Sequence, residues 1–117
     1  MPSMLSVQAG QAEVKPTGFE QNILEGECAI SQVGLGEVSD HKFGAWQVSP
    51  GVFTSTWEDW EAFTIVSGRG TLVDGSGKEH ALVPGALVVI PPRSTGTWRI
   101  EETVRKTYVY PENSVGR

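Results

Sequence analysis

Two glycine-punctuated blocks decide the fold predicted for this chain. The first reads Gly51-Val-Phe-Thr-Ser-Thr-Trp57-Glu58-Asp59-Trp60-Glu61 and continues for six residues to Gly68. The second reads Gly85-Ala-Leu-Val-Val-Ile-Pro91-Pro-Arg-Ser-Thr-Gly96-Thr-Trp98. Between them, Val73-Asp74-Gly75-Ser76-Gly77-Lys78 has the composition of a tight hairpin turn. The blocks therefore predict short strands that are joined by glycine and proline turns.

The rest of the chain continues this pattern. No ten-residue window shows an amphipathic helical stripe free of Gly or Pro, which predicts an all-β sandwich or barrel. We expect a turn at Ser67-Gly68-Arg69 and a buried strand over 86–90. The last hairpin is expected to join strands over 97–101 and 104–110 through Glu102-Thr103.

The domain organisation follows from length and from the position of these strands. The 117 residues suit a single domain, which we place at 19–117 with its core at 46–110. Residues 1–18 are polar and lack a sustained period, so we expect an irregular N-terminal arm. Both faces of the strand over 61–66 are fairly apolar, which places it between two packed layers.

Composition limits the classes of function. Nine basic and fourteen acidic residues give a formal net charge of −5, which argues against nucleic-acid binding. No apolar run approaches the roughly 20 residues that cross a bilayer, so we expect no membrane partner. The single cysteine, Cys28, indicates no intramolecular disulfide, a cytoplasmic setting and a structural thiol.

The two blocks resemble the signature motifs of the cupin superfamily, a small jelly-roll β-barrel. Those motifs are written G-x5-H-x-H-x3,4-E-x6-G and G-x5-P-x-G-x2-H-x3-N. The matching positions in this chain are Gly51, Glu61, Gly68, Gly85 and Pro91. The resemblance covers about residues 40–110. It implies a single cupin jelly-roll β-barrel, and because relatives of this kind are commonly dimers, it also implies a homodimer.

A narrower resemblance lies in three further stretches. They read Trp46-x3-Pro50-Gly51, Gly96-Thr97-Trp98 and Glu102-Thr-Val-Arg-Lys106-Thr-Tyr108. These are similar to the subfamily that includes the cupin domain of (S)-ureidoglycine aminohydrolase, and also to small ethanolamine-utilisation cupins. One fold hosts many functions, so this likeness indicates a fold more than a reaction.

The departures from the motifs concern the metal ligands. Typical metal cupins hold a divalent ion with three histidines and a glutamate. Here the H-x-H region reads Thr54-Ser55-Thr56-Trp57, and the histidine position of the second motif is Gly96. Glu61 alone remains, so we expect no metal and no other cofactor at the usual position. The two histidines, His41 and His80, do not fall on ligand positions.

Strand alternation assigns the candidate site to the barrel interior. Burying one charge alone is costly, so Glu61 and Lys106 are each expected to be the partner of the other. We predict them as a catalytic pair that shares proton transfer with a bound substrate. The predicted substrate-binding walls are Trp46, Trp57, Trp98 and Tyr108. The alternative is that the pair only fixes strand register and the aromatic residues only form core.

Three functions remain open from the sequence. The first is a metal-independent barrel that binds a small polar nitrogen compound or a carboxylate, with or without catalysis. The second is a metal-dependent enzyme of the ureidoglycine aminohydrolase type, which would need ligands such as His41 or His80. The third is a non-catalytic accessory domain that acts through its dimer surface.

Overall fold

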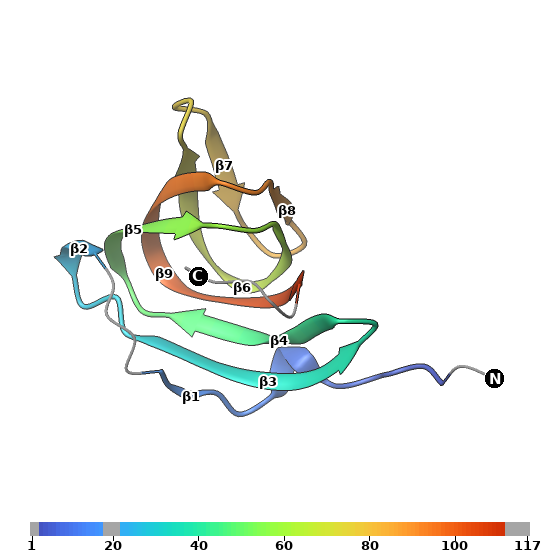
Figure 1. Ribbon diagram of the computed structural model, residues 1–117. Helices are drawn as coiled ribbons and strands as arrows, with labels where there is room; N and C mark the ends of the chain where they lie inside the picture. Colours follow the sequence, from blue (N-terminus) through green and yellow to red (C-terminus); the bar gives the residue numbers. More distant parts are fainter. Residues whose placement is uncertain (1–2, 18–21, 112–117) are drawn as a thin grey trace.

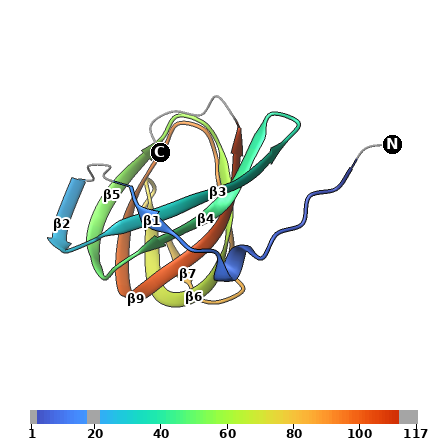
Figure 2. The same cartoon turned by 90° about the horizontal axis from the view of Figure 1, so that it is seen from below.

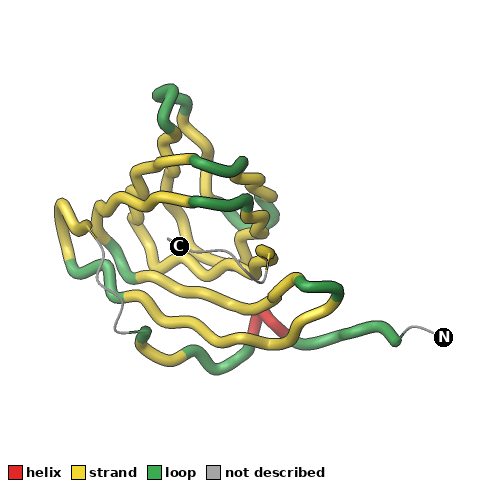
Figure 3. The backbone as a smooth tube through the Cα atoms, viewed as in Figure 1, coloured by secondary structure: helices red, strands yellow, loops and turns green. Residues whose placement is uncertain are grey.

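The protein is an all-β, cupin-like curled antiparallel sheet, as the sequence predicted (Figure 1). The computed structural model describes residues 3–17 and 22–111. Within these ranges the helical structure is one 3-10 turn, η1 (Ala9–Gln11) (Figure 3). No helix in the described part of the chain is long and apolar enough to cross a membrane. The strands are β1 (Lys15–Pro16), β2 (Asn22–Gly26), β3 (Ile30–Val38), β4 (His41–Val48), β5 (Gly51–Trp57), β6 (Glu61–Asp74), β7 (Glu79–Leu82), β8 (Leu87–Ile90) and β9 (Ser94–Pro111).

Two long strands, β6 and β9, form the spine of the sheet. They pair with each other over nearly their whole length, from Ala62 opposite Val109 to Asp74 opposite Gly96. On its other edge β9 pairs first with β5 and then with β4. Figure 1 shows both strands curving around the interior, so one face of each is concave. The inward side chains of the spine therefore meet across a single core.

A bulged segment of β6 at 65–70 changes which residues face that core. Before it Glu61, Phe63 and Ile65 are buried, whereas after it Leu72 is buried. The register with β9 shifts three times between Ile65 and Gly70, while β9 buries even-numbered residues on both sides of this segment, with Glu102 opposite the bulge exposed. Because side chains alternate along a strand, a one-residue slip exchanges the two faces.

This bulge replaces the predicted turn at Ser67-Gly68-Arg69, which was wrong. The predicted last hairpin at Glu102-Thr103 was also wrong, because β9 runs without interruption from Ser94 to Pro111. Gly68 has a φ of +96°, the left-handed geometry that a turn or a bulge can use. Arg69 lies opposite Glu102 in the ladder, so both strands bend together at the place where sequence reasoning put two reversals.

The outer face is less covered than we expected. The predicted buried strand over 86–90 is instead an edge strand, β8, which pairs with β6 alone. Val88 and Ile90 are buried, whereas Leu87 is 67% and Val89 66% exposed. On β6 the outward Val66 is also exposed. The outer face of β6 and β8 is thus exposed, and β6 does not lie between two packed layers as we expected.

The chain before β2 lies partly against the sheet. β1 pairs with β3, and Arg105 of β9 donates from Nη1 to the carbonyl of Ala12 at 2.7 Å. Figures 1 and 2 show β1 beside β3, with the residues before η1 leading away from the sheet. The predicted irregular arm is therefore held against the sheet over residues 9–16 by these contacts. Its ends at 1–2 and at 18 fall outside the described residues.

We predict that Gly68→Ala is far more damaging than Gly85→Ala. Both glycines have a positive φ, which costs an alanine about 1–2 kcal/mol. A Cβ at Gly68 would also run into the carbonyl oxygen of Thr103, whereas a Cβ at Gly85 meets nothing within 4 Å. Urea denaturation should show a loss for Gly68→Ala at least about 2 kcal/mol beyond that of the control. Equal losses would contradict the close approach of β6 to β9.

Candidate functional site

The predicted charged pair lies inside the barrel. Glu61 begins β6 and Lys106 lies in the second half of β9; they are 1% and 3% exposed. Lys106 donates from Nζ to Glu61 Oε2 at 2.8 Å, and Trp57 donates from Nε1 to Glu61 Oε1 at 3.0 Å. Each carboxylate oxygen therefore accepts a hydrogen bond from a buried donor. The predicted burial and pairing are confirmed, while the catalytic role stays a prediction.

Aromatic faces surround the lysine ammonium. Lys106 Nζ lies 4.3 Å from the ring centroid of Trp46, 4.2 Å from that of Phe63 and 5.0 Å from that of Trp98. A desolvated cation over an aromatic face gains on the order of 2 kcal/mol. These contacts, together with the carboxylate, compensate for the hydration that the ammonium loses on burial. Phe63 belongs to this cage, although sequence reasoning did not place it among the site residues.

The predicted tryptophan walls form one cluster around Trp98. Its ring centroid is 5.3 Å from Trp46 and 6.1 Å from Trp57, and its Nε1 donates to Ser55 Oγ at 3.0 Å. Phe53 stacks on Trp98 at 5.7 Å with an interplanar angle of 8°. All three tryptophans are less than 10% exposed. The three tryptophans therefore pack against one another in the core, and their predicted role as substrate-binding walls stays a prediction.

Tyr108 lies on the same inner face of β9 as Lys106 and is 5% exposed. Its hydroxyl approaches Gly44 of β4 so closely that a Cβ there would collide with it. Its ring lies 5.5 Å from that of Tyr110. Tyr108 therefore packs where β4 and β9 meet. Its predicted role in substrate binding is untested.

The residues around Glu61 do not suit a divalent metal. Both carboxylate oxygens are engaged by Trp57 and Lys106, and an ammonium at 2.8 Å repels a second cation. At Gly96, a Cβ would lie 3.0 Å from Leu72 Cδ1 and 3.3 Å from Trp57 Cζ3, which leaves no room for an imidazole. In the described ranges 3–17 and 22–111, no three His, Cys, Asp or Glu side chains are grouped so that they could hold an ion.

The two histidines lie elsewhere. His41, on β4, packs its ring 5.6 Å from Trp60, and its Nδ1 is 2.7 Å from the carbonyl of Ser39. His80, on β7, pairs with Asp74 at the end of β6. Neither histidine contacts Glu61, which removes the support for His41 or His80 as ligands of a metal there.

Comparison with known proteins now fixes the family. The EutQ-like cupin domain family matches residues 35–108, which is most of the chain. The chain belongs to the EutQ-like cupin family. The likeness to the ureidoglycine aminohydrolase subfamily receives no specific support. No protein of curated function matches the chain.

Solved structures support the fold of this EutQ-like cupin. The EutQ protein of Clostridium difficile superimposes with a TM-score of 0.73 at 18% identity, over 92% of this chain and 87% of that one. A putative ethanolamine utilization protein Q of Salmonella typhimurium gives 0.65 at 21%, over 73% and 72%. The polyketide cyclase RemF of Streptomyces resistomycificus gives 0.72 at 19%, over 96% and 82%. At such identities the likeness shows the fold alone.

In the part of this EutQ-like cupin that the structure describes, an open cavity and a more enclosed one lie away from the charged pair. The first, which we call the arm groove, is an open apolar cavity of about 270 Å³ between Val7 and Ala9 of the arm and strands β3, β4, β6, β8 and β9. The second, the hairpin cavity, is a more enclosed space of about 100 Å³ between β5, β6, β7, β8 and residues 91–96. Neither is lined by Glu61 or Lys106; Trp57 lines the hairpin cavity.

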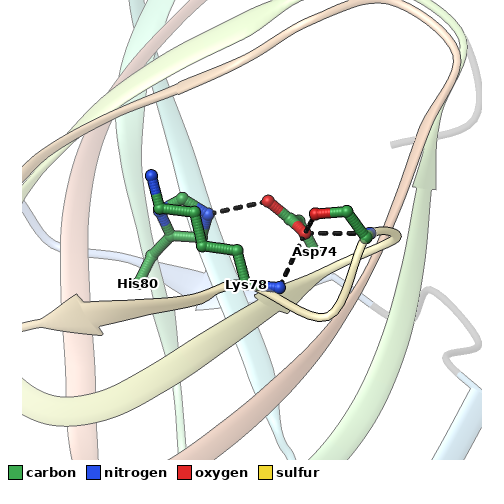
Figure 4. Close-up of polar contacts among 4 residues, drawn as sticks. Asp74, Lys78 and His80 are labelled. Atoms are coloured by element: carbon green, nitrogen blue, oxygen red, sulfur yellow. Dashed lines mark hydrogen bonds and ion pairs between the residues drawn. The ribbon is translucent and has the colours of Figure 1, made fainter.

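Sequence reasoning missed the pairing at the hairpin cavity. Asp74 Oδ2 lies 2.9 Å from His80 Nε2, across the turn between β6 and β7 (Figure 4). Oδ1 of Asp74 accepts from the backbone N–H and the hydroxyl of Ser76 and from the N–H of Lys78. The hydrogen bonds from His80 and then Ser76 hold the pKa of Asp74 well below its ordinary value. The Asp-Gly turn was recognised in the sequence, but the six-residue separation from His80 was not used.

Cys28 is buried and its thiol donates to the carbonyl of Glu25 at 3.3 Å. Burial raises the pKa of the thiol, so the nucleophilic thiolate is disfavoured. This environment is consistent with the structural role that we expected for Cys28.

We predict that breaking the buried pair costs far more than breaking a surface pair. Lys106→Met leaves the Glu61 carboxylate buried without its cation, which should cost about 3–5 kcal/mol. Arg69→Met removes the 3.0 Å bridge to Glu101, whose side chains are more than half exposed, and should cost less than about 1 kcal/mol. The double variant Glu61→Leu with Lys106→Met should recover much of the loss. Urea denaturation measures the stability of all three variants. Equal losses of stability in Lys106→Met and Arg69→Met would contradict the larger contribution of the buried pair.

We also predict a pH-dependent contribution from Asp74. Because its pKa is lower in the folded than in the unfolded protein, the ionised carboxylate stabilises the fold above the ordinary carboxyl pKa of about 3.9. That contribution is lost as the pH falls toward the lower folded pKa. Asp74→Asn should therefore be less stable than the unchanged protein at neutral pH, with a difference that shrinks in acid. A difference that is constant with pH in urea denaturation would contradict this.

Proposed function

We propose that this EutQ-like cupin is a metal-independent, small-molecule-binding barrel in which Lys106 supplies the positive charge beside Glu61. The observation that carries the proposal is the 2.8 Å contact between the two groups at less than 4% exposure. Replacing such a pair by apolar residues is often neutral or stabilising, so stability alone is a weak reason to keep it. A desolvated, coupled acid and base is the usual composition of a proton-transfer site.

The roles follow from the donors that are present. Glu61 would anchor a ligand or exchange a proton with it, and Lys106 would hold the carboxylate ionised or donate to a ligand oxygen. The ligand class is a small polar nitrogen compound or a carboxylate, because both can exchange hydrogen bonds with an ammonium and a carboxylate. Trp46, Trp57 and Trp98 would be the walls, and Trp57 is the wall that also lines a cavity.

The side-chain packing sets a condition on this function. Glu61, Lys106 and the three tryptophans are all less than 10% exposed, so a ligand must displace part of the wall to reach the pair. Trp57 separates the hairpin cavity from Glu61, since its ring lines that cavity and its Nε1 binds the carboxylate. Movement of the Trp57 indole would open the path and release one oxygen of Glu61.

A ligand screen by thermal shift tests the proposal. The panel holds small amides, amines, ureides and carboxylates, and the variants are Glu61→Gln and Lys106→Met. Val104→Ala is the matched control, because Val104 is fully buried on the same face of β9 and its truncation destabilises the fold without touching the pair. A hit should stabilise the unchanged protein and Val104→Ala, and should lose at least about tenfold in affinity in both pair variants. A hit that is retained in both pair variants would overturn the proposal.

The metal-dependent alternative has its own measurement. Elemental analysis of purified protein should find less than about one-tenth of an equivalent of any transition metal. A stoichiometric ion that is lost in Glu61→Gln would replace our proposal by the metal-dependent one. The accessory-domain alternative draws support from the exposed Leu87 and Val89 on the outer face, which a second copy of the chain would cover.

A further inference from the structure

We propose that the arm groove receives the N-terminal arm of a second copy of this chain, so that two copies exchange their arms about a two-fold axis. The arm means here the residues 3–8 that precede η1. This interaction surface lies apart from the charged pair, since neither Glu61 nor Lys106 lines the arm groove. Three features of the molecule support the exchange: the composition of its outer face, the position of the groove and the reach of the arm.

The outer face of four neighbouring strands, β4, β9, β6 and β8, is uncharged. Two rows of side chains cross this face, because residues that are paired across a sheet point to the same side. The first row is Phe43, Val109, Ala62 and Val89, and the second row is Ala45, Thr107, Thr64 and Leu87. Neither row holds a charged residue, although the chain has a formal net charge of −5. Two copies of this acidic chain can therefore meet here without bringing like charges together.

Exposed apolar side chains gather on this face and on the arm. Among residues 3–17 and 22–111, ten large apolar side chains are exposed, and six of them lie in these two places. On the face they are Val66, Leu87 and Val89, and on the arm they are Met4, Leu5 and Val7. Because an extended exposed apolar surface marks an interaction site, this gathering selects the face and the arm as the two halves of one interface.

The groove and the root of the arm lie on the same face. Arg105, whose position on β9 is on the outer side, donates from Nη1 to the carbonyl of Ala9 in η1 at 3.4 Å. The arm groove is lined by Val7 and Ala9 and also by Leu87 of β8. When two copies stack these faces about a two-fold axis, the root of each arm therefore comes to lie beside the groove of the other copy.

Met4 is the anchor that the arm offers. Its side chain is 100% exposed, whereas Leu5 lies against β3, where a Cβ on Gly36 would be 2.7 Å from Leu5 Cδ2. Figures 1 and 2 show the arm leading away from the sheet beyond η1. The groove of about 270 Å³ has room for about nine waters, which exceeds the volume of one methionine side chain. A flexible thioether side chain also adapts to an irregular apolar surface.

The dimensions of the arm and of the face fit this exchange. Four strands about 4.8 Å apart make a face about 19 Å wide, and six extended residues reach about 20 Å. Six residues along each strand give this face a length of about 20 Å and an area of roughly 400 Å². A stable interface buries about 800 Å² per partner, so the face alone is too small. An extended segment of six residues exposes roughly 900 Å², and burial of half of it supplies the rest.

The mass in solution tests the dimer. Interfaces of this size bind in the micromolar range or more tightly, so light scattering at about 100 μM protein should give twice the chain mass of 12.6 kDa. Met4→Glu and Leu87→Glu should each weaken the dimer at least about tenfold, because each places a charge in an apolar contact. Ile23→Glu is the matched control, since Ile23 is an exposed apolar residue of β2, away from the arm (Figures 1 and 2).

Two results of this measurement would overturn the proposal. One is a monomeric protein, including a monomer whose groove binds an apolar dye, because the groove then has another occupant. The other is a dimer that Met4→Glu weakens no more than Ile23→Glu does, because the arm then takes no part. Met4, Leu87 and Ile23 are all exposed, so the three variants keep the core that folds each copy.

Cross-linking distinguishes exchanged arms from arms that stay on their own chain. Equal amounts of Met4→Cys protein and Leu87→Cys protein are mixed and mildly oxidised. A disulfide that joins the two variants, identified by mass spectrometry, is expected because the arm of one copy lies on the outer face of the other. Cys28 is 3% exposed and does not compete. A mixture of Met4→Cys with Ile23→Cys should give no such product. Equal yields in the two mixtures, or no mixed disulfide in the first, would overturn the exchange.

Discussion

The fold is built around one buried cation. The ammonium of Lys106 has a carboxylate on one side and aromatic faces on the others, and these partners come from three strands. Glu61 and Phe63 lie on β6, Trp46 on β4 and Trp98 on β9 itself. A buried ammonium needs partners that replace its lost hydration. These strands must therefore keep their register, because the register places those partners around Lys106. The inner face of the barrel is therefore specified by a polar contact as well as by apolar area.

The contact between Lys106 and Glu61 puts an ammonium where a typical metal cupin holds its ion. A metal ion accepts several ligands and can gain or lose one while it stays bound, whereas an ammonium offers only three hydrogen bonds and a fixed charge. Here two donors already meet the carboxylate, and the position of the second-motif histidine is filled by the side chains of Leu72 and Trp57. The function that we propose for this centre therefore uses proton exchange and hydrogen bonding in place of coordination.

Much of this arrangement was readable from the sequence, for a physical reason. Alternation along a strand is strict, so the inward placement of Glu61, Lys106 and Trp98 followed once the strands were recognised. The buried pairing of Glu61 with Lys106 followed because a charge that is buried alone is costly, so each group needed the other. What the sequence did not show was where the strands bend. Gly68 and the polar pair at Glu102-Thr103 signal a reversal and a bulge equally well, because both use the same backbone geometry. The Asp74–His80 contact was hidden for a similar reason, since it depends on how the hairpin folds back.

Because of the bulge at 65–70 of β6, the sequences of the two ends of the barrel can change independently of each other. Odd-numbered residues of β6 face the interior before the bulge, and even-numbered residues face it after the bulge. The bulge therefore changes the side-chain alternation between the two halves of one strand. The half that carries Glu61 is tied to the ammonium and has little freedom to vary. The half that carries Leu72 and Asp74 is released from that constraint. A lineage can therefore remodel the hairpin end for new ligands while the centre of the barrel stays as it is.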